Sequence, residues 1–213
     1  MADEQATIID QQYTSGIALI TYLKGQSEIT LANEAESNFS KNILLSAASF
    51  FEKEISDTIV EFSKTHSNDD TLVISIIAAK AVKRQYHTYF DWEKGTNANS
   101  FFALFGEEFK NKMAKKVKDE AKLDESIKAF LQLGQERNKL VHQNFAEIIL
   151  DKTAEEIYNL YKTSLLFIST IKSELITNLP EGNNVQKTTS TLQTPVSLIL
   201  IAIIIGLIIY IVY

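Results

Sequence analysis

The residues best suited to chemistry in this 213-residue sequence lie in one short stretch, Glu136–Phe145, which reads ERNKLVHQNF. It holds Arg137, one of only two arginines beside nineteen lysines, then Asn138, and five residues after the arginine His142, one of three histidines. A guanidinium group can hold a phosphate through two hydrogen bonds, and histidine exchanges protons near neutral pH. These residue types are suited to cleaving a phosphodiester, and Lys139 adds positive charge.

RNA can be cleaved without a metal ion, because its own 2′-hydroxyl can attack the phosphate if protons are transferred and charge is stabilised. His142 would exchange the protons, Arg137 would hold the phosphate, and Asn138 would orient the imidazole or bind the phosphate. Positions five apart on a helix differ by about 140°. Arg137 and His142 therefore converge only if the helix ends or bends near His142, or if two copies meet across a two-fold axis. The spacing favours a homodimer without requiring one, and it also fits an exposed helix end.

Positive charge is concentrated in the second part of the chain. Residues 1–70 carry 12 acidic and 4 basic side chains, whereas residues 71–193 carry 15 acidic and 17 basic ones. We therefore expect RNA to meet the second part. Six lysines lie within Lys110–Lys122, and we predict that Lys115 and Lys116 bind substrate together with Lys139. A solvated helix face is the other interpretation of these lysines.

Several other kinds of site are excluded or disfavoured. The chain has no cysteine, which excludes disulfides and thiolate-bound zinc. His66, His87 and His142 are far apart in sequence and lie near no carboxylate at ligand spacing, and no glycine-rich phosphate loop is present. We predict neither a metal nor a cofactor. Trp92, with the aromatic residues that precede it, can stack on a base or form part of the core.

The elements that must position these residues are predicted to be helices. Proline occurs only at positions 180 and 195, and apolar residues recur at steps of three and four. The fold class is therefore all-α, a bundle of four to six antiparallel helices within residues 1–179. The expected helices are Glu4–Lys24, Leu31–Phe62, one from Asp70 or Thr71 to Phe90, two between Phe101 and Lys122, one capped by Asp124 and reaching Val141, and one opened by the capping box Thr153–Glu156.

The end of the sequence differs from the rest in composition. Residues 180–195 are polar and predict a linker, and residues 196–213, VSLILIAIIIGLIIYIVY, carry no charge. As a helix those eighteen residues span about 27 Å, close to the thickness of a bilayer core. We expect a transmembrane helix that anchors the protein by its C-terminus, with the domain facing the cytoplasm because Lys187 precedes the span. A buried core helix is the alternative.

The motif RNKLVH resembles the signature of the HEPN superfamily, an Arg, a polar residue that is often Asn, and a His four to six positions after the Arg. The segments LLSAASFFEKEI (44–55) and FFALFG (101–106) and the helix after DKTAEEIY (151–158) are similar to the RiboL-PSP-HEPN branch, so that the resemblance covers roughly Leu31 to Leu175. It implies a HEPN-like helical fold and a dimeric, metal-independent endoribonuclease, often a toxin or an antiviral defence effector. Arg137, Asn138 and His142 would be its catalytic residues, and Glu52 would be either a buried partner of Arg137 or a surface residue.

Three functions follow from these features. The first is a membrane-anchored endoribonuclease that cleaves RNA by 2′-hydroxyl attack. The second is a non-catalytic helical module that dimerises or holds a partner at the membrane. The third makes the apolar tail the effector, a membrane-perturbing segment that the domain regulates. If the protein is a toxin, an inhibitory partner protein could accompany it, and the sequence does not identify one.

Overall fold

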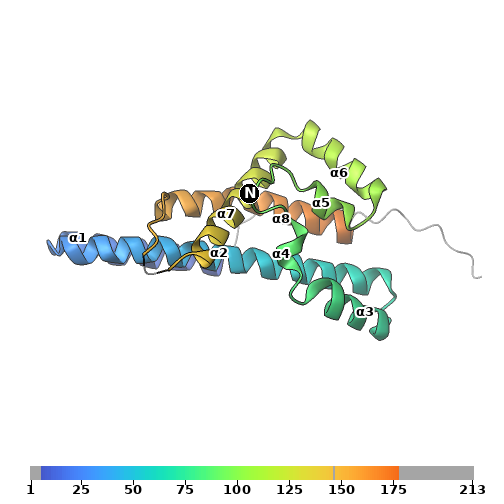
Figure 1. The fold of residues 1–213 in the computed structure, drawn as a ribbon, viewed down its shortest axis with the longest axis horizontal. Helices are drawn as coiled ribbons and strands as arrows, with labels where there is room; N and C mark the ends of the chain where they lie inside the picture. Colours follow the sequence, from blue (N-terminus) through green and yellow to red (C-terminus); the bar gives the residue numbers. More distant parts are fainter. Residues whose placement is uncertain (1–5, 146, 178–213) are drawn as a thin grey trace, which may run out of the picture. The chain divides into compact units, whose positions relative to one another are not determined.

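The computed structural model describes residues 6–145 and 147–177. All regular structure in these residues is helical, which confirms the all-α prediction for them. Eight α-helices and two π-helical segments follow one another there (Figure 1): α1 (Ile8–Gly25), α2 (Ile29–His66), α3 (Thr71–Ile77), η1 (Ala78–Val82), α4 (Tyr86–Tyr89), α5 (Asn99–Ala103), α6 (Glu107–Asp119), α7 (Ala121–His142), α8 (Ala154–Lys172) and η2 (Ser173–Thr177).

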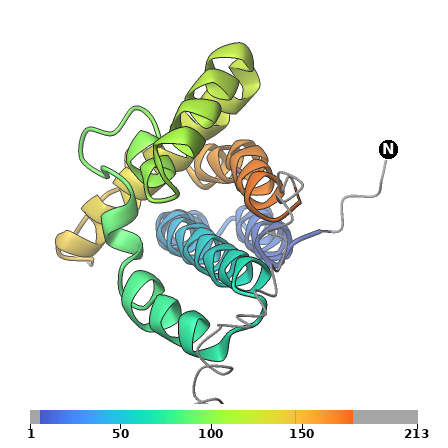
Figure 2. The ribbon, with the colours of Figure 1, turned by 90° about the vertical axis from the view of Figure 1, so that its right-hand side faces the viewer.

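The long helix α2 is the centre of the arrangement and packs against α1, α7 and α8. Helices α1, α2 and α8 lie lengthwise beside one another, and all three are seen end-on in Figure 2. Helix α7 crosses them and packs closely on α8 (Figure 2). The prediction of Leu31–Phe62 as one long helix is confirmed, since both positions fall within α2.

Three predicted helix boundaries need correction. The first helix begins at Ile8, because the Thr7 side chain caps it by accepting a hydrogen bond from the Asp10 amide; the predicted start, Glu4, lies outside the described residues. The helix expected to reach Phe90 is interrupted between η1 and α4. Asp124 does not cap α7, which begins three residues earlier at Ala121; its carboxylate pairs instead with Lys128 at 2.6 Å.

Two predicted caps are confirmed. The Asp70 carboxylate accepts hydrogen bonds from the amides of Leu72 and Val73 and opens α3. Thr153 and Glu156 form the capping box that opens α8, with the Thr153 hydroxyl accepting from the Glu156 amide at 3.2 Å. These caps bond the first N–H groups of each helix, which have no partner within the helix.

An aromatic cluster fills the space where α2, α7 and α8 meet. The rings of Phe51 and Phe130 lie 5.6 Å apart, those of Phe51 and Tyr161 5.4 Å apart, and those of Phe130 and Phe167 5.0 Å apart, all in buried positions. Burying rings of this size supplies much of the hydrophobic free energy that fixes α7 on α2. The orientation of α7, which carries the ERNKLVH motif, is set by this cluster.

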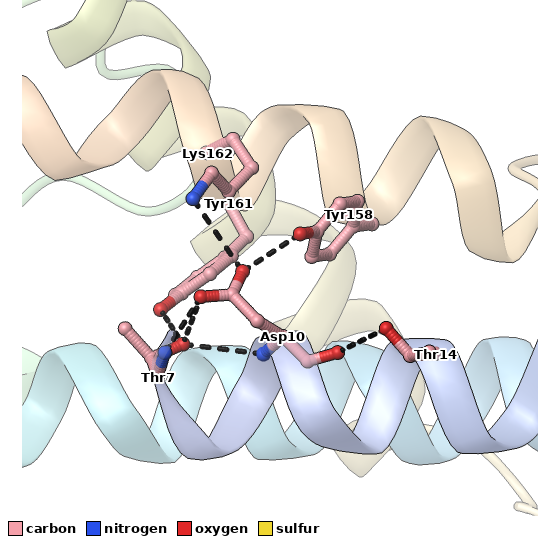
Figure 3. A network of polar contacts seen from close by, with 6 residues as sticks. All are labelled: Thr7, Asp10, Thr14, Tyr158, Tyr161 and Lys162. Carbon is pink, nitrogen blue, oxygen red and sulfur yellow. Dashed lines mark hydrogen bonds and ion pairs between the residues drawn. The ribbon is translucent and has the colours of Figure 1, made fainter. Parts of the chain in front are cut away.

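A polar network joins the start of α1 to α8 (Figure 3). The Asp10 carboxylate accepts a hydrogen bond from the Tyr158 hydroxyl at 2.7 Å, pairs with Lys162 at 3.5 Å, and accepts from the Thr7 amide at 2.7 Å. The Thr7 hydroxyl also lies 2.8 Å from the buried Tyr161 hydroxyl. The N-terminal cap of α1 is thereby fastened to the helix that closes the domain.

The predicted linker and transmembrane helix, residues 180–195 and 196–213, lie outside the described residues. Within the part that the structure describes, no helix is long and apolar enough to cross a membrane.

Candidate active site

A pocket of about 160 Å³ opens between α2, the segment around α4 (residues 84–92, called the α4 segment below) and α7, and three of the predicted site residues line it, Arg137, Asn138 and Glu52. Helix α7 contributes its apolar wall and two motif residues, α2 contributes an aromatic floor and a carboxylate, and the α4 segment closes the other side. The residues lining it are Ala48, Phe51, Glu52, Arg84, Tyr86, His87, Trp92, Phe130, Leu133, Gly134, Arg137 and Asn138.

Arg137 and Asn138 reach this pocket because of their register on α7. Leu133 and Leu140, four residues before and three residues after Arg137, are fully buried on the same face of the helix, whereas Arg137 and Asn138 are half-buried. The Arg137 Nη1 donates a hydrogen bond to the Asn138 Oδ1 at 3.1 Å. Among the described residues Arg137 forms no ion pair, so its charge stays available to a ligand in the pocket.

His142 is the last residue of α7 and is exposed. The helix ends there, which is one of the two conditions under which its imidazole can meet Arg137. Asn138 and His142 are four residues apart, so their side chains share a face with about 6 Å between their Cβ atoms. His142 does not itself line the pocket. One copy of the chain places the imidazole one helical turn beyond the pocket edge.

The loop that follows α7 is fastened to α2. The buried Lys41 ammonium donates a hydrogen bond to the Phe145 carbonyl at 2.9 Å and lies 5.1 Å from the centre of the Phe145 ring. The backbone turns from helical to extended at Gln143, between His142 and this anchor. Lys41 therefore anchors to α2 the backbone three residues after His142.

Glu52 lines the pocket from α2, but it is exposed. In the described part of the chain its carboxylate makes no ion pair with Arg137 within 4.0 Å. Glu52 is therefore a carboxylate at the pocket wall and not a buried partner that fixes the guanidinium.

The three predicted lysines lie away from this pocket. Lys139 is exposed and pairs with Glu136 at 3.0 Å, one position beyond the lining residue Asn138. Lys115 and Lys116 belong to α6, which contributes no lining residue. The Lys116 ammonium lies 3.1 Å from Glu120 and 3.4 Å from the buried Glu174, so that it helps to hold α6 against η2.

The structure brings to the pocket two basic residues that the motif did not identify, Arg84 and His87. Arg84 follows η1 with a φ of 60°, in the left-handed region. This conformation costs a non-glycine residue about 1 kcal/mol or more. The sequence signal that could have identified Arg84 is composition, because it is the only other arginine of a lysine-rich chain. It lines the same pocket as the motif arginine.

Trp92 packs against the backbone of α7 at Gly134. A Cβ atom at that position would lie 2.1 Å from the indole ring, so only glycine permits this contact. The Trp92 Nε1 donates a hydrogen bond to the His87 carbonyl at 3.0 Å. Trp92 thus holds the α4 segment, with its basic residues, against α7. It is both a packed aromatic residue and a wall of the pocket.

Tyr86 remains protonated at any physiological pH. Burial of its hydroxyl raises its pKa, the negative charge of Glu52 raises it further, and the positive charge of Arg137 opposes the rise. Tyr86 therefore lines the pocket as a neutral side chain.

The pocket combines fixed positive charge, neutral donors and an aromatic wall, a combination that suits an anionic ligand with a planar group. Within residues 6–145 and 147–177, no cluster of three or more His, Asp or Glu is arranged to hold a metal ion.

The sequence profile of the RiboL-PSP-HEPN family matches residues 13–177, well over half of the chain. The protein therefore belongs to the RiboL-PSP-HEPN family. No curated protein and no solved structure matches it. The matched region contains the whole pocket and every residue of the ERNKLVH motif.

Proposed function

We propose that this chain is a metal-independent endoribonuclease, anchored to a membrane by its C-terminal segment. The observation that carries the proposal is the placement of Arg137 and Asn138 in a pocket with the exposed His142 one turn further on, on the same face as Asn138. HEPN domains are generally associated with ribonucleases, which supports a nuclease role.

The reaction divides between the motif residues. The RNA 2′-oxygen attacks the phosphorus and gives its proton to an imidazole, the bond from phosphorus to the 5′-oxygen breaks, and that oxygen takes a proton from an imidazolium. Arg137 binds the non-bridging oxygens and stabilises the charge that builds on them. The products are a 2′,3′-cyclic phosphate and a 5′-hydroxyl.

The reaction needs both a proton acceptor and a proton donor, while one copy of the chain offers a single His142. A homodimer with α7 near the two-fold axis would supply one imidazole from each copy. The exposed position of His142 at the end of α7 leaves it accessible to such a partner. The dimer is part of the proposal.

The test is cleavage of labelled RNA by the purified full chain in the presence of EDTA. We expect products that end in 2′,3′-cyclic phosphate, and we expect His142→Ala and Arg137→Ala to lose cleavage. His66→Ala is the matched control, since His66 is exposed on α2, where its ring lies against Phe62 of the same helix. Cleavage that is equal in His142→Ala and the control would refute the proposed mechanism.

The membrane anchor and the biological role are separate parts of the proposal. The uncharged residues 196–213 support an anchor, with the domain on the cytoplasmic side. Deleting them should release the protein from membranes while cleavage is retained. A toxin or defence role predicts that overexpression halts growth and that Arg137→Ala relieves it. Harmless overexpression of a catalytically active chain would contradict that role.

A second candidate is a non-catalytic dimerisation or scaffold module at the membrane. It is favoured by the exposed apolar side chains around the turn between α1 and α2, namely Leu19, Tyr22, Ile29 and Leu31. This function predicts that partner binding depends on those residues and is indifferent to Arg137. RNA cleavage that requires Arg137 would support the nuclease function over the scaffold function.

A further inference from the structure

Both arginines of the chain line the same pocket, although they lie in different elements. Arg137 comes from α7, and Arg84 comes from the turn between η1 and α4. The remaining nineteen cations of the Lys and Arg set are lysines, and none of those in residues 6–145 and 147–177 lines this pocket. Guanidinium groups differ from ammonium groups in offering a planar pair of donors that matches two phosphate oxygens.

The Arg84 side chain is available for such a contact. It is exposed, and it forms no hydrogen bond or ion pair with another residue of the described part of the chain. Its left-handed backbone is not favoured by an arginine side chain, so local folding does not account for the residue type. A strained conformation of this kind is often found where a side chain serves a ligand.

The net charge of the side chains that line the pocket matches a ligand with one negative charge. Two guanidinium groups and one carboxylate, that of Glu52, line the pocket, and no other acidic residue of the described part of the chain does. The excess is one positive charge when His87 is neutral. An RNA phosphodiester carries one negative charge, which balances that excess.

We propose that Arg84 is a second phosphate-binding residue of this site, so that one RNA phosphate is held between the guanidinium groups of Arg84 and Arg137. This inference rests on the proposed nuclease function and adds the residue that positions the scissile or a neighbouring phosphate. The contact of Trp92 with Gly134 and with the His87 carbonyl keeps the Arg84 turn facing α7.

The experiment measures RNA affinity in full chains that also carry His142→Ala, so that binding is separated from cleavage. Fluorescence anisotropy with a short single-stranded RNA is recorded over a series of salt concentrations. Arg84→Gln should weaken binding about tenfold or more. It should also reduce the slope of log K against log salt by about 0.7, the value for one lost phosphate contact on a single strand.

Three further variants make the result specific. Lys83→Gln removes the neighbouring exposed charge, which does not line the pocket, and should leave affinity and slope nearly unchanged. Arg84→Lys should keep the slope but lose affinity, because an ammonium group cannot bind two oxygens in parallel. Arg84→Asn suits the left-handed backbone and should repeat the glutamine result in a protein whose folding is not in question.

The outcomes separate the inference from the proposed function. If Arg84→Gln and Arg84→Asn match Lys83→Gln in both affinity and slope, the inference is overturned. Cleavage by the parent chain, which retains His142, would still support the nuclease. If the slope falls but the parent chain does not cleave RNA, Arg84 stands as a phosphate ligand and the nuclease function fails. If none of these chains binds RNA and the chain that retains His142 does not cleave it, both proposals fail.

Discussion

The Asp10 network and the Arg137 pocket both contain charged side chains, but they differ in how many bonds those charges make within the protein. In the network, the Asp10 carboxylate has bonds from Tyr158, Lys162 and Thr7, and each of these contacts joins α1 to α8 or caps α1 (Figure 3). Among the residues that the structure describes, Arg137 in the pocket forms one hydrogen bond, to the neighbouring Asn138 side chain, and Arg84 forms no hydrogen bond or ion pair.

The difference separates two uses of polar groups. A charge whose bonds are all made inside the protein contributes to stability, and removing its partner leaves buried polar groups unpaired. A charge held at the wall of a pocket without partners adds little to stability and is ready for a ligand. Substitutions in the network should therefore change the free energy of unfolding, whereas those in the pocket should change RNA binding and cleavage.

The largest expected effect is on catalysis. Arg137→Ala should reduce the rate constant of RNA cleavage by about 10² to 10³ or more, because it removes a donor to the developing phosphate charge. The thermal unfolding midpoint should stay close to that of the parent chain, since the lost bond joins adjacent side chains. The measurements are single-turnover cleavage in EDTA and unfolding by circular dichroism. A large loss of stability would show that Arg137 is structural.

Gly134→Ala should break the pocket and the packing together. The added Cβ would lie 2.1 Å from the Trp92 ring, and forcing an atom into such a contact costs about 1 to 3 kcal/mol. Trp92 is the only tryptophan, so its fluorescence reports on this site alone. We expect an altered emission spectrum, lower stability in urea and weaker RNA binding. Gly25→Ala, with no atom within 4 Å of the new Cβ, is the control.

Asp10→Ala should show the reverse pattern to Arg137→Ala. Loss of the capping box and of the bond from Tyr158 should lower the free energy of unfolding by about 2 kcal/mol. Cleavage of RNA per folded molecule should be unchanged, because Asp10 lies outside the pocket. Urea unfolding and cleavage assays on the same preparation check this. A comparable loss of cleavage at full folding would end the separation of the two regions.

The network also predicts how stability depends on pH. The hydrogen bond to Asp10, with burial and the Asp10 charge, raises the pKa of Tyr158 to about 12. The contribution of Tyr158 is complete below the pKa of an unfolded tyrosine, about 10. It is lost as the pH rises towards 12, because the unfolded chain releases the proton first. Tyr158→Phe should be less stable at pH 8 and should lose less stability between pH 10 and 12.

Asp10 gives the corresponding change in acid. Burial alone would raise its pKa, but the bonds from Tyr158 and Thr7 and the charge of Lys162 outweigh burial and lower it. Its contribution is present above the pKa of an unfolded aspartate and is lost as the pH falls through the lower folded value. Asp10→Asn should therefore flatten the acid limb of the stability curve. An unchanged acid limb would mean that other carboxylates govern it.

The smallest expected effect is on stability at Arg84. Asparagine adopts the left-handed region more readily than arginine, so Arg84→Asn should stabilise the fold by up to about 1 kcal/mol. The same substitution should weaken RNA binding. A higher free energy of unfolding in urea together with weaker RNA binding by anisotropy would show that the strain at Arg84 serves the ligand. A loss of both stability and RNA binding would show that Arg84 has a structural role.

Much of the helical pattern can be read from the sequence, because α2 and α8 carry regular apolar stripes and α8 opens with a capping box. The break before α4 cannot be read in the same way. Nothing in the letters of Lys83–Gln85 marks a left-handed turn, since no glycine is present there. Tertiary packing of Trp92 on Gly134 accompanies that turn, and such packing has no local signature.

The candidate site divides in the same way. Arg137, Asn138 and His142 are predicted from the resemblance of their motif to the HEPN signature, since their types and spacing alone also fit an exposed helix end. Arg84 and His87 could not be predicted in this way, because they reach the pocket through the path of the chain between α3 and α5. The lysines of α6 were selected by charge alone, and the ion pairs of Lys116 with Glu120 and Glu174 depend on contacts that composition does not specify.

The central claim is that the pocket between α2, α4 and α7 receives an RNA phosphate. The most direct test is an experimental structure of the full chain bound to an RNA oligonucleotide whose 2′-hydroxyls are replaced by hydrogen, so that it cannot be cleaved by internal attack. We predict a phosphate between the Arg84 and Arg137 guanidinium groups, with a His142 imidazole beside it. A bound oligonucleotide whose phosphates contact α6 or another surface, with the pocket unoccupied, would contradict the claim.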